Sequence, residues 1–157
     1  MQTTLLRQYQ LVTGARAALF NYCETVRNDD LLTPLPSFND ESMISQMTHV
    51  ANCYLFWLAH YAMQDHRPFF QNQANKSMND VKQDYEQVNM MINEFLHKYG
   101  QALDVPITFL RHGNMLTTTP LQVFTHVTTH EFHHKGQVLN MSRQLGYIPA
   151  DTDVIRT

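Results

Sequence analysis

The chain has 157 residues, 43% of them hydrophobic, which predicts a single domain over residues 1–157 with one continuous core. The net charge of −3 includes no long run of one sign, so we predict neither nucleic-acid binding nor attachment to a membrane surface. The 2 cysteines are too few for a disulfide framework. No apolar run suggests a membrane span or a signal peptide, and we expect a cytoplasmic protein.

The first half of the chain contains two stretches with the apolar spacing of amphipathic helices. The first stretch starts near Leu5 and runs to about residue 27. The second opens near Ser37 or Asp40, either of which can cap the helix, and continues to Arg67. The LLTPLP stretch between them predicts a break in the helical structure.

Two further helices are predicted in the second half. The third opens at a capping box made by Ser77 and Asp80 and ends near residue 100. The fourth opens at Thr119, with Pro120 at its first position, and ends at Gly146. The stretch VPITFLRHGNMLTTT between these helices suits a short hairpin. Four amphipathic helices around one core predict an all-α four-helix bundle.

The predicted fourth helix is rich in histidine. Since an α-helix turns by about 100° per residue, His126, His130 and His134 lie within about 80° of one another, on the apolar face. Gln137 lies on the same face, one turn further on. Imidazole rings in an apolar core need polar partners, and His130 and His134 are spaced to bind one metal ion together.

A third metal ligand has to come from another helix. His49 lies at the edge of the apolar stripe of the second helix, and Cys53 lies one turn later. We take His49 as the third ligand and Cys53 as the alternative.

The letters HEFHH at 130–134 match the H-E-x-x-H motif of zinc proteases. Such proteases take a third ligand from the chain after the motif, and neither histidine nor glutamate follows His134 here. Two E-x-x-H pairs, Glu94 with His97 and Glu131 with His134, also match the motifs of a di-iron bundle. Glu94 and His97 are, however, predicted to face outward. Neither reading is favoured.

The stretch HVTTHEFHHKGQVLNMSRQLGY resembles the signature of the DinB/YfiT-like proteins, in which H-x-x-x-H is followed by H-R-G-Q and L-R-Q-L-G. The stretch MTHVANCYLFWL resembles a second block of that family. The resemblance implies an up-down-down-up four-helix bundle in which His49, His130 and His134 bind one divalent ion, commonly zinc or nickel. It gives His126 no ligand role, and Lys135 stands where the family usually has arginine.

Three neutral imidazoles leave an ion with an open coordination position, as catalytic zinc sites do. The resemblance implies a metal-dependent transferase that joins a low-molecular-weight thiol, as cosubstrate, to an electrophile, and it implies a homodimer. The alternatives are a metal-dependent hydrolase that uses a metal-bound water and a non-catalytic metal-binding stress-response module.

Four residues are candidates for supporting such a site. Gln137 and Tyr54 are placed to orient a ring or a ligand, although Tyr54 also suits a structural role. His126 is a candidate neighbour of the metal. Glu131 is either an acid–base group or a residue exposed to solvent or at an interface.

Overall fold

The computed structural model describes residues 2–111 and 113–156, with the backbone alone for residue 2. Its α-helices are α1 (Gln2–Cys23), α2 (Asn28–Leu32), α3 (Met43–Tyr54), α4 (Met78–Tyr99) and α5 (Pro120–Gln144). A 3₁₀-helix, η1 (Pro36–Phe38), a π-helix, η2 (Leu55–Met63), and two strands, β1 (Ile107–Arg111) and β2 (Asn114–Thr118), complete the described elements.

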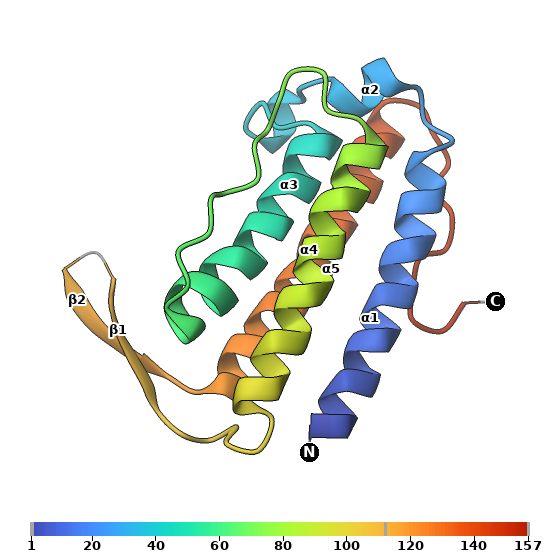
Figure 1. Cartoon of the computed structure of the whole chain (residues 1–157). Helices are drawn as coiled ribbons and strands as arrows, with labels where there is room; N and C mark the ends of the chain where they lie inside the picture. The colour runs from blue at the N-terminus through green and yellow to red at the C-terminus, as the bar shows by residue number, and fades with distance from the viewer. Residues whose placement is uncertain (1, 112, 157) are drawn as a thin grey trace.

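The long helices run in the directions that the family resemblance implies (Figure 1). α1 and α5 point one way, whereas α3 and α4 point the other way. The connection formed by residues 64–77 travels back along the length of the molecule, so that α3 and α4 run in the same direction. The Tyr85 hydroxyl near the start of α4 donates to the Met47 carbonyl near the start of α3, which fixes this parallel pairing.

Two of the predicted helix starts are confirmed by their caps. Ser77 and Asp80 form a reciprocal capping box at the start of α4. Thr119 caps α5, with Pro120 in the first turn and a capping box to Gln122. Each box satisfies backbone N–H groups that have no partner inside the helix.

The predicted start of the second long helix is wrong. Its cap is Ser42, which forms a capping box with Ser45. Ser37 lies in η1, where its hydroxyl donates to Gln144 Oε1, and Asp40 has a left-handed backbone with a φ of 58°. The chain from residue 37 to residue 41 is therefore a turn rather than the first turn of a helix.

The first two long helices also end differently from the prediction. α1 stops at Cys23, before the predicted end near residue 27, and a separate short helix, α2, follows beyond that predicted end. α3 changes to π winding at Leu55, and η2 ends at Met63, where the next residue, Gln64, has a left-handed backbone with a φ of 59°. Because a π-helix closes i→i+5 hydrogen bonds, side chains beyond Leu55 take a different rotation from the one a continuous α-helix predicts.

The two strands form an antiparallel hairpin, as the sequence allowed. The register pairs Ile107 with Thr118 and Arg111 with Asn114, and Gly113 in the turn has a φ of 79°. The hairpin packs on η2, where the Phe109 ring lies 4.1 Å from the Tyr61 ring between centroids.

The molecule is mostly helical, which confirms the expected helical character. Because the hairpin forms a small two-stranded sheet, the fold is not the purely all-α four-helix bundle that we predicted. Side chains from α1, α3, η2, α4 and α5 form one buried cluster between the long helices. Among the described residues, none of the helices is long and apolar enough to cross a membrane.

Candidate metal centre

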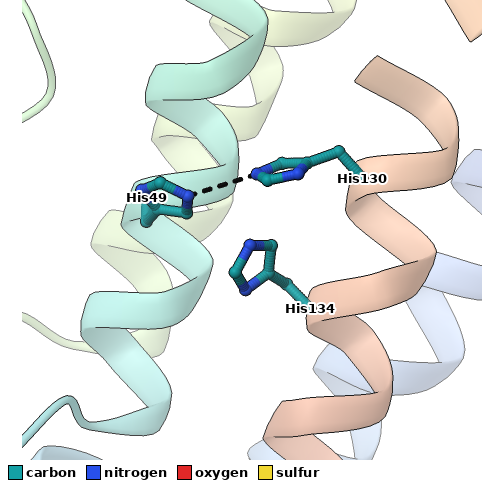
Figure 2. A group of neighbouring side chains, drawn as sticks. All are labelled: His49, His130 and His134. Carbon is teal, nitrogen blue, oxygen red and sulfur yellow. Dashed lines mark hydrogen bonds between the residues drawn. The ribbon is translucent and has the colours of Figure 1, made fainter. Parts of the chain in front are cut away.

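Three histidine side chains from two helices meet at one place on the molecule (Figure 2). His49 comes from α3, and His130 and His134 come from α5. One ring nitrogen of each lies within 4.8 Å of the others. The sequence prediction named these three residues, and the structure brings them together across 81 residues of sequence.

The helix geometry explains why the rings converge. His130 and His134 are one turn apart on α5 and face α3, which packs antiparallel to α5. Their ring centroids are 4.4 Å apart, and the His49 ring lies 5.3 Å from His130 and 4.8 Å from His134.

The spacing of the nitrogens suits a single ion. His49 Nε2 and His130 Nε2 are 3.2 Å apart. Two nitrogens bound at about 2.0–2.1 Å to one tetrahedral zinc ion lie about 3.3 Å from each other. The separation of the His49 and His130 nitrogens therefore matches the one that a single tetrahedral ion requires, and the His134 nitrogen lies within 4.8 Å of both.

A glutamine holds the His134 ring in place. His134 Nδ1 contacts Gln46 Oε1 at hydrogen-bonding distance, and a glutamine oxygen can only accept, so Nδ1 is the donor. Nε2 then keeps its lone pair for a metal, which is the usual arrangement of a histidine ligand. Gln46 lies on α3, one turn before His49, and sequence analysis did not identify it.

The electrostatics of the cluster keep two of the rings neutral. Burial, followed by the neighbouring His134 and His49 rings, lowers the pKa of His130 to about 4. Burial, followed by the His49 and His133 rings, lowers the pKa of His134 to about 4. Neutral imidazoles are the form that binds metal, so both rings are ready to act as ligands at neutral pH.

One side of the cluster is open. His49 is an exposed residue, whereas His130 and His134 are half-buried. A groove of about 450 Å³ starts at His49 and His130 and is lined further along by the aromatic rings of Phe56, Trp57 and Phe69. Its volume is in the range of small-molecule binding sites.

Cys53 and His126 lie in this groove, next to the three-histidine cluster. Cys53 Sγ is 4.0 Å from His126 Nε2, and both ligand atoms lie within 4.8 Å of a nitrogen of His130. Burial raises the pKa of the Cys53 thiol to about 12, so the side chain is a protonated thiol at neutral pH. Burial, and then the charge of Arg111, lowers the pKa of His126.

Glu131 lies in the protein interior, which corrects the expectation of a solvated residue. It is 7% exposed, and its two carboxylate oxygens accept hydrogen bonds from Arg16 Nε at 2.7 Å and Arg16 Nη2 at 2.8 Å. The Tyr54 hydroxyl donates to Oε2 at 2.5 Å. The carboxylate is therefore bonded to Arg16 on α1 and Tyr54 on α3. Glu131 is thus not placed as the glutamate of a protease H-E-x-x-H motif would be, beside a metal-bound water.

The other two supporting candidates, Tyr54 and Gln137, differ in burial and in the side chains that they contact. Tyr54 is 0% exposed and bonds to Glu131, so it contacts the ion-pair network rather than the groove. Gln137 is half-buried, and its Nε2 lies 3.2 Å from Nε2 of the exposed His133.

Lys135 anchors the C-terminal segment. Its Nζ donates to the Thr152 carbonyl at 2.7 Å and lies 3.5 Å from Asp153 Oδ1, and the residue is 8% exposed. Lys135, which stands where the DinB/YfiT-like signature usually has arginine, thus binds the C-terminal segment of the same chain.

No curated protein matches the chain in sequence. The family comparison matches the DinB family over residues 1–157, the whole length of the sequence. The helical fold and the histidine cluster agree with what the sequence resemblance implied. The chain therefore belongs to the DinB family.

Proposed function

We propose that this protein binds one divalent ion, zinc or nickel, through His49, His130 and His134, and uses it to join a low-molecular-weight thiol to an electrophile. The observation that carries the proposal is the combination of three converging imidazoles with an exposed side that opens into an aromatic groove. A structural zinc site is closed by four protein ligands, whereas a catalytic site keeps a position for a reactant.

The chemistry of such a site follows from its ligands. An ion held by His49, His130 and His134 would keep its full positive charge, because the three rings are uncharged, and it would lower the pKa of a thiol beside it towards the thiolate form. The sulfur forms a bond to the electrophilic carbon, the leaving group departs with its bonding electrons, and the thiol proton passes to solvent.

The chain's own residues bind and orient the reactants. Gln46 fixes the His134 tautomer, and the edge-to-face contact between Trp57 and His126, with 4.9 Å between centroids, forms part of the groove wall. Aromatic walls suit a small organic molecule better than a polypeptide. The two partners of the reaction therefore enter through the groove rather than through the packed interior.

A feature of the groove favours thiol transfer over hydrolysis. Its described lining residues include no carboxylate, and Glu131 is paired with Arg16 in the interior. A hydrolase needs a general base beside its water, most often a histidine or a carboxylate, and among the described groove residues outside the proposed ligand set only the His126 ring is of these two kinds. A thiol, in contrast, needs only deprotonation and positioning.

The first experiment measures the metal itself. Wild-type protein, His49→Ala and His97→Ala are purified without chelating resin and analysed for bound metal. His97 is an exposed histidine on α4 and serves as the matched control. We expect one ion per chain in the wild type and in the control, and less than a tenth of that content in His49→Ala. Equal metal content in all three proteins would contradict the ligand set.

The second experiment measures turnover. Metal-loaded protein is mixed with N-acetylcysteine or glutathione and an activated aryl halide, and the loss of free thiol and the release of halide are followed together. We expect both to rise in step with wild-type protein and to fall to background with His49→Ala. Full metal content without any thiol consumption would refute the transferase and favour a metal-binding module.

A further inference from the structure

The groove beside the histidine cluster contains an arginine that has no ion-pair partner among the described residues. Arg111, the last residue of β1, lines the groove together with His126 and His130. Within residues 2–111 and 113–156 no carboxylate forms an ion pair with Arg111, and its buried Nε–H has no hydrogen-bond acceptor. The other arginines with buried or half-buried heads, Arg16 and Arg67, each bind a carboxylate.

The surroundings of Arg111 hold its guanidinium in one place. Its Cζ lies 5.1 Å from the centroid of the Trp57 ring and 5.9 Å from that of Phe56. Contacts of this kind restrain the guanidinium against the two aromatic rings. A buried N–H without an acceptor is costly, so the position gains from a ligand that supplies one.

The chemical class of that ligand follows from the donor. Two parallel N–H groups of a guanidinium match the two oxygens of a carboxylate, and this paired hydrogen bond is stronger than one between neutral groups. The rings of Trp57 and His126, 4.9 Å apart, and those of His126 and His130, 5.6 Å apart, continue from Arg111 to the histidine cluster. An apolar stem between the carboxylate and the reacting atom would lie along these rings.

We propose that the groove binds a small carboxylate-bearing molecule, with its carboxylate on Arg111, its apolar stem against Trp57 and its other end at His130 and His49. The carboxylate site stands on the geometry around Arg111. The identification of its ligand as a reactant rests on the proposed transfer reaction. Either the thiol or the electrophile can carry the carboxylate, and the two experiments below separate these sources.

The first test uses metal-free protein and does not depend on any activity. Trp57 is the single tryptophan of the chain, so its fluorescence reports directly on the groove. Phenylacetate and its uncharged analogue phenylacetamide are titrated at constant ionic strength. We expect phenylacetate to bind about tenfold tighter than phenylacetamide in wild-type protein, since only phenylacetate pairs with the guanidinium.

Variants assign that preference to the arginine. Arg111→Gln should bind the two compounds equally, and Arg111→Lys should keep part of the preference because it keeps the charge but not the paired hydrogen bonds. Arg143→Gln, at an exposed position near the end of α5, should behave as wild type. Equal affinities for the two compounds in wild-type protein would overturn the carboxylate site, even if no Arg111 variant folds.

The second test identifies which reactant carries the carboxylate. Cobalt-loaded protein is titrated with N-acetylcysteine and with N-acetylcysteamine, which lacks the carboxylate, and thiolate binding is read from the sulfur-to-cobalt absorption. A tenfold tighter binding of N-acetylcysteine that Arg111→Gln removes supports a carboxylate on the thiol. Equal binding of both thiols, with the phenylacetate preference intact, supports a carboxylate on the electrophile. If neither thiol produces the sulfur-to-cobalt absorption, the proposed transfer reaction is refuted. The carboxylate site is then judged by the phenylacetate titration alone.

Discussion

At the scale of single residues, the candidate metal centre depends on contacts that its ligands make away from the metal. Gln46 accepts a hydrogen bond from His134, and it is only 8% exposed, so water cannot easily replace it. Partners of this kind set the tautomer and the ring orientation of a metal ligand, and their loss typically weakens metal affinity by about 10- to 100-fold.

The first prediction concerns this glutamine. Gln46→Ala should weaken zinc binding by about 10- to 100-fold while leaving the stoichiometry at one ion per chain. The measurement is a competition titration against a zinc-binding dye. Gln87→Ala, an exposed glutamine on α4, is the control and should bind as wild type. An unchanged affinity in Gln46→Ala would show that His134 is oriented by other contacts.

The second prediction concerns pH. His130 and His134 have a pKa of about 4 in the folded protein and an ordinary value of 6.5. Between these values the unfolded chain binds protons that the folded chain does not, so stability is full above pH 6.5 and falls towards pH 4. Metal-free protein should therefore unfold at a lower urea concentration at pH 5 than at pH 7.

A variant tests whether these two rings cause the effect. The double change His130→Asn and His134→Asn removes both titrating groups, so the difference between the urea midpoints at pH 5 and pH 7 should become smaller. A midpoint that does not fall on acidification of the wild type would contradict the low pKa values.

At the scale of the elements, a buried polar network joins the long helices. Arg16 on α1 binds Glu131 on α5, and Nη1 of Arg16 donates to Asn89 on α4 at 2.9 Å. Tyr54 at the end of α3 also donates to Glu131, and burial, followed by the Glu131 charge, raises the Tyr54 pKa, so the phenol remains a donor. The network thus fixes how the helices that carry the histidines are placed against α1 and α4.

The third prediction concerns this network. Glu131→Gln should lower the free energy of unfolding by about 3 kcal/mol, because it leaves the buried Arg16 charge without its counterion. The expected bound metal is still one ion per chain, since Glu131 does not contact the cluster. Urea denaturation and metal analysis of the same sample measure the two quantities.

A double-mutant cycle separates the pair from its surroundings. Arg16→Gln combined with Glu131→Gln should be less destabilising than the sum of the single changes, by at least about 1 kcal/mol. Additive effects would show that the two side chains do not depend on each other. Loss of metal in Glu131→Gln at full stability would instead return the glutamate to the metal site.

At the scale of the whole molecule, the candidate ligands link segments that are distant in the chain. His49 lies on α3, whereas the other two lie on α5, and α3 and α5 are packed against each other along their length. An ion that binds only the folded arrangement stabilises it in proportion to its concentration over its dissociation constant.

The fourth prediction concerns thermal stability. Zinc at 100 times its dissociation constant should add about 2.7 kcal/mol to the free energy of unfolding. For a chain of this size that corresponds to a rise in Tm of about 5–10 °C, measured by circular dichroism with zinc and with a chelator. His49→Ala should show no such rise, whereas the exposed-histidine control His97→Ala should show it in full.

Much of the fold and the candidate site could be predicted from local patterns. Capping boxes such as Ser77 with Asp80 depend on residues three positions apart, and the i, i+4 spacing of His130 and His134 places both rings on one face of a helix. The start of the second long helix was misplaced because several polar residues between 37 and 42 can each cap a helix. Which of them does so depends on the turn before it.

Other features depend on partners that the sequence does not pair. Arg16 and Gln46 carry no motif, and each gains its role only when α1 or α3 packs against α5. Glu131 is a further example. Its position in the H-E-x-x-H motif suggests a metal site, but in the folded protein it forms an ion pair with Arg16.

The sequence alone determined the helical character and the family, because helix periodicity and motif spacing act over a few residues. It also predicted His49, His130 and His134 as one group of ligands. Only the tertiary structure decided the neighbours of these residues. Contact of α3 with α5 brings His49 and Gln46 to the cluster, and contact of β1 with η2 places Arg111 over Trp57. Such contacts form between residues tens of positions apart, where no local pattern specifies which side chains meet.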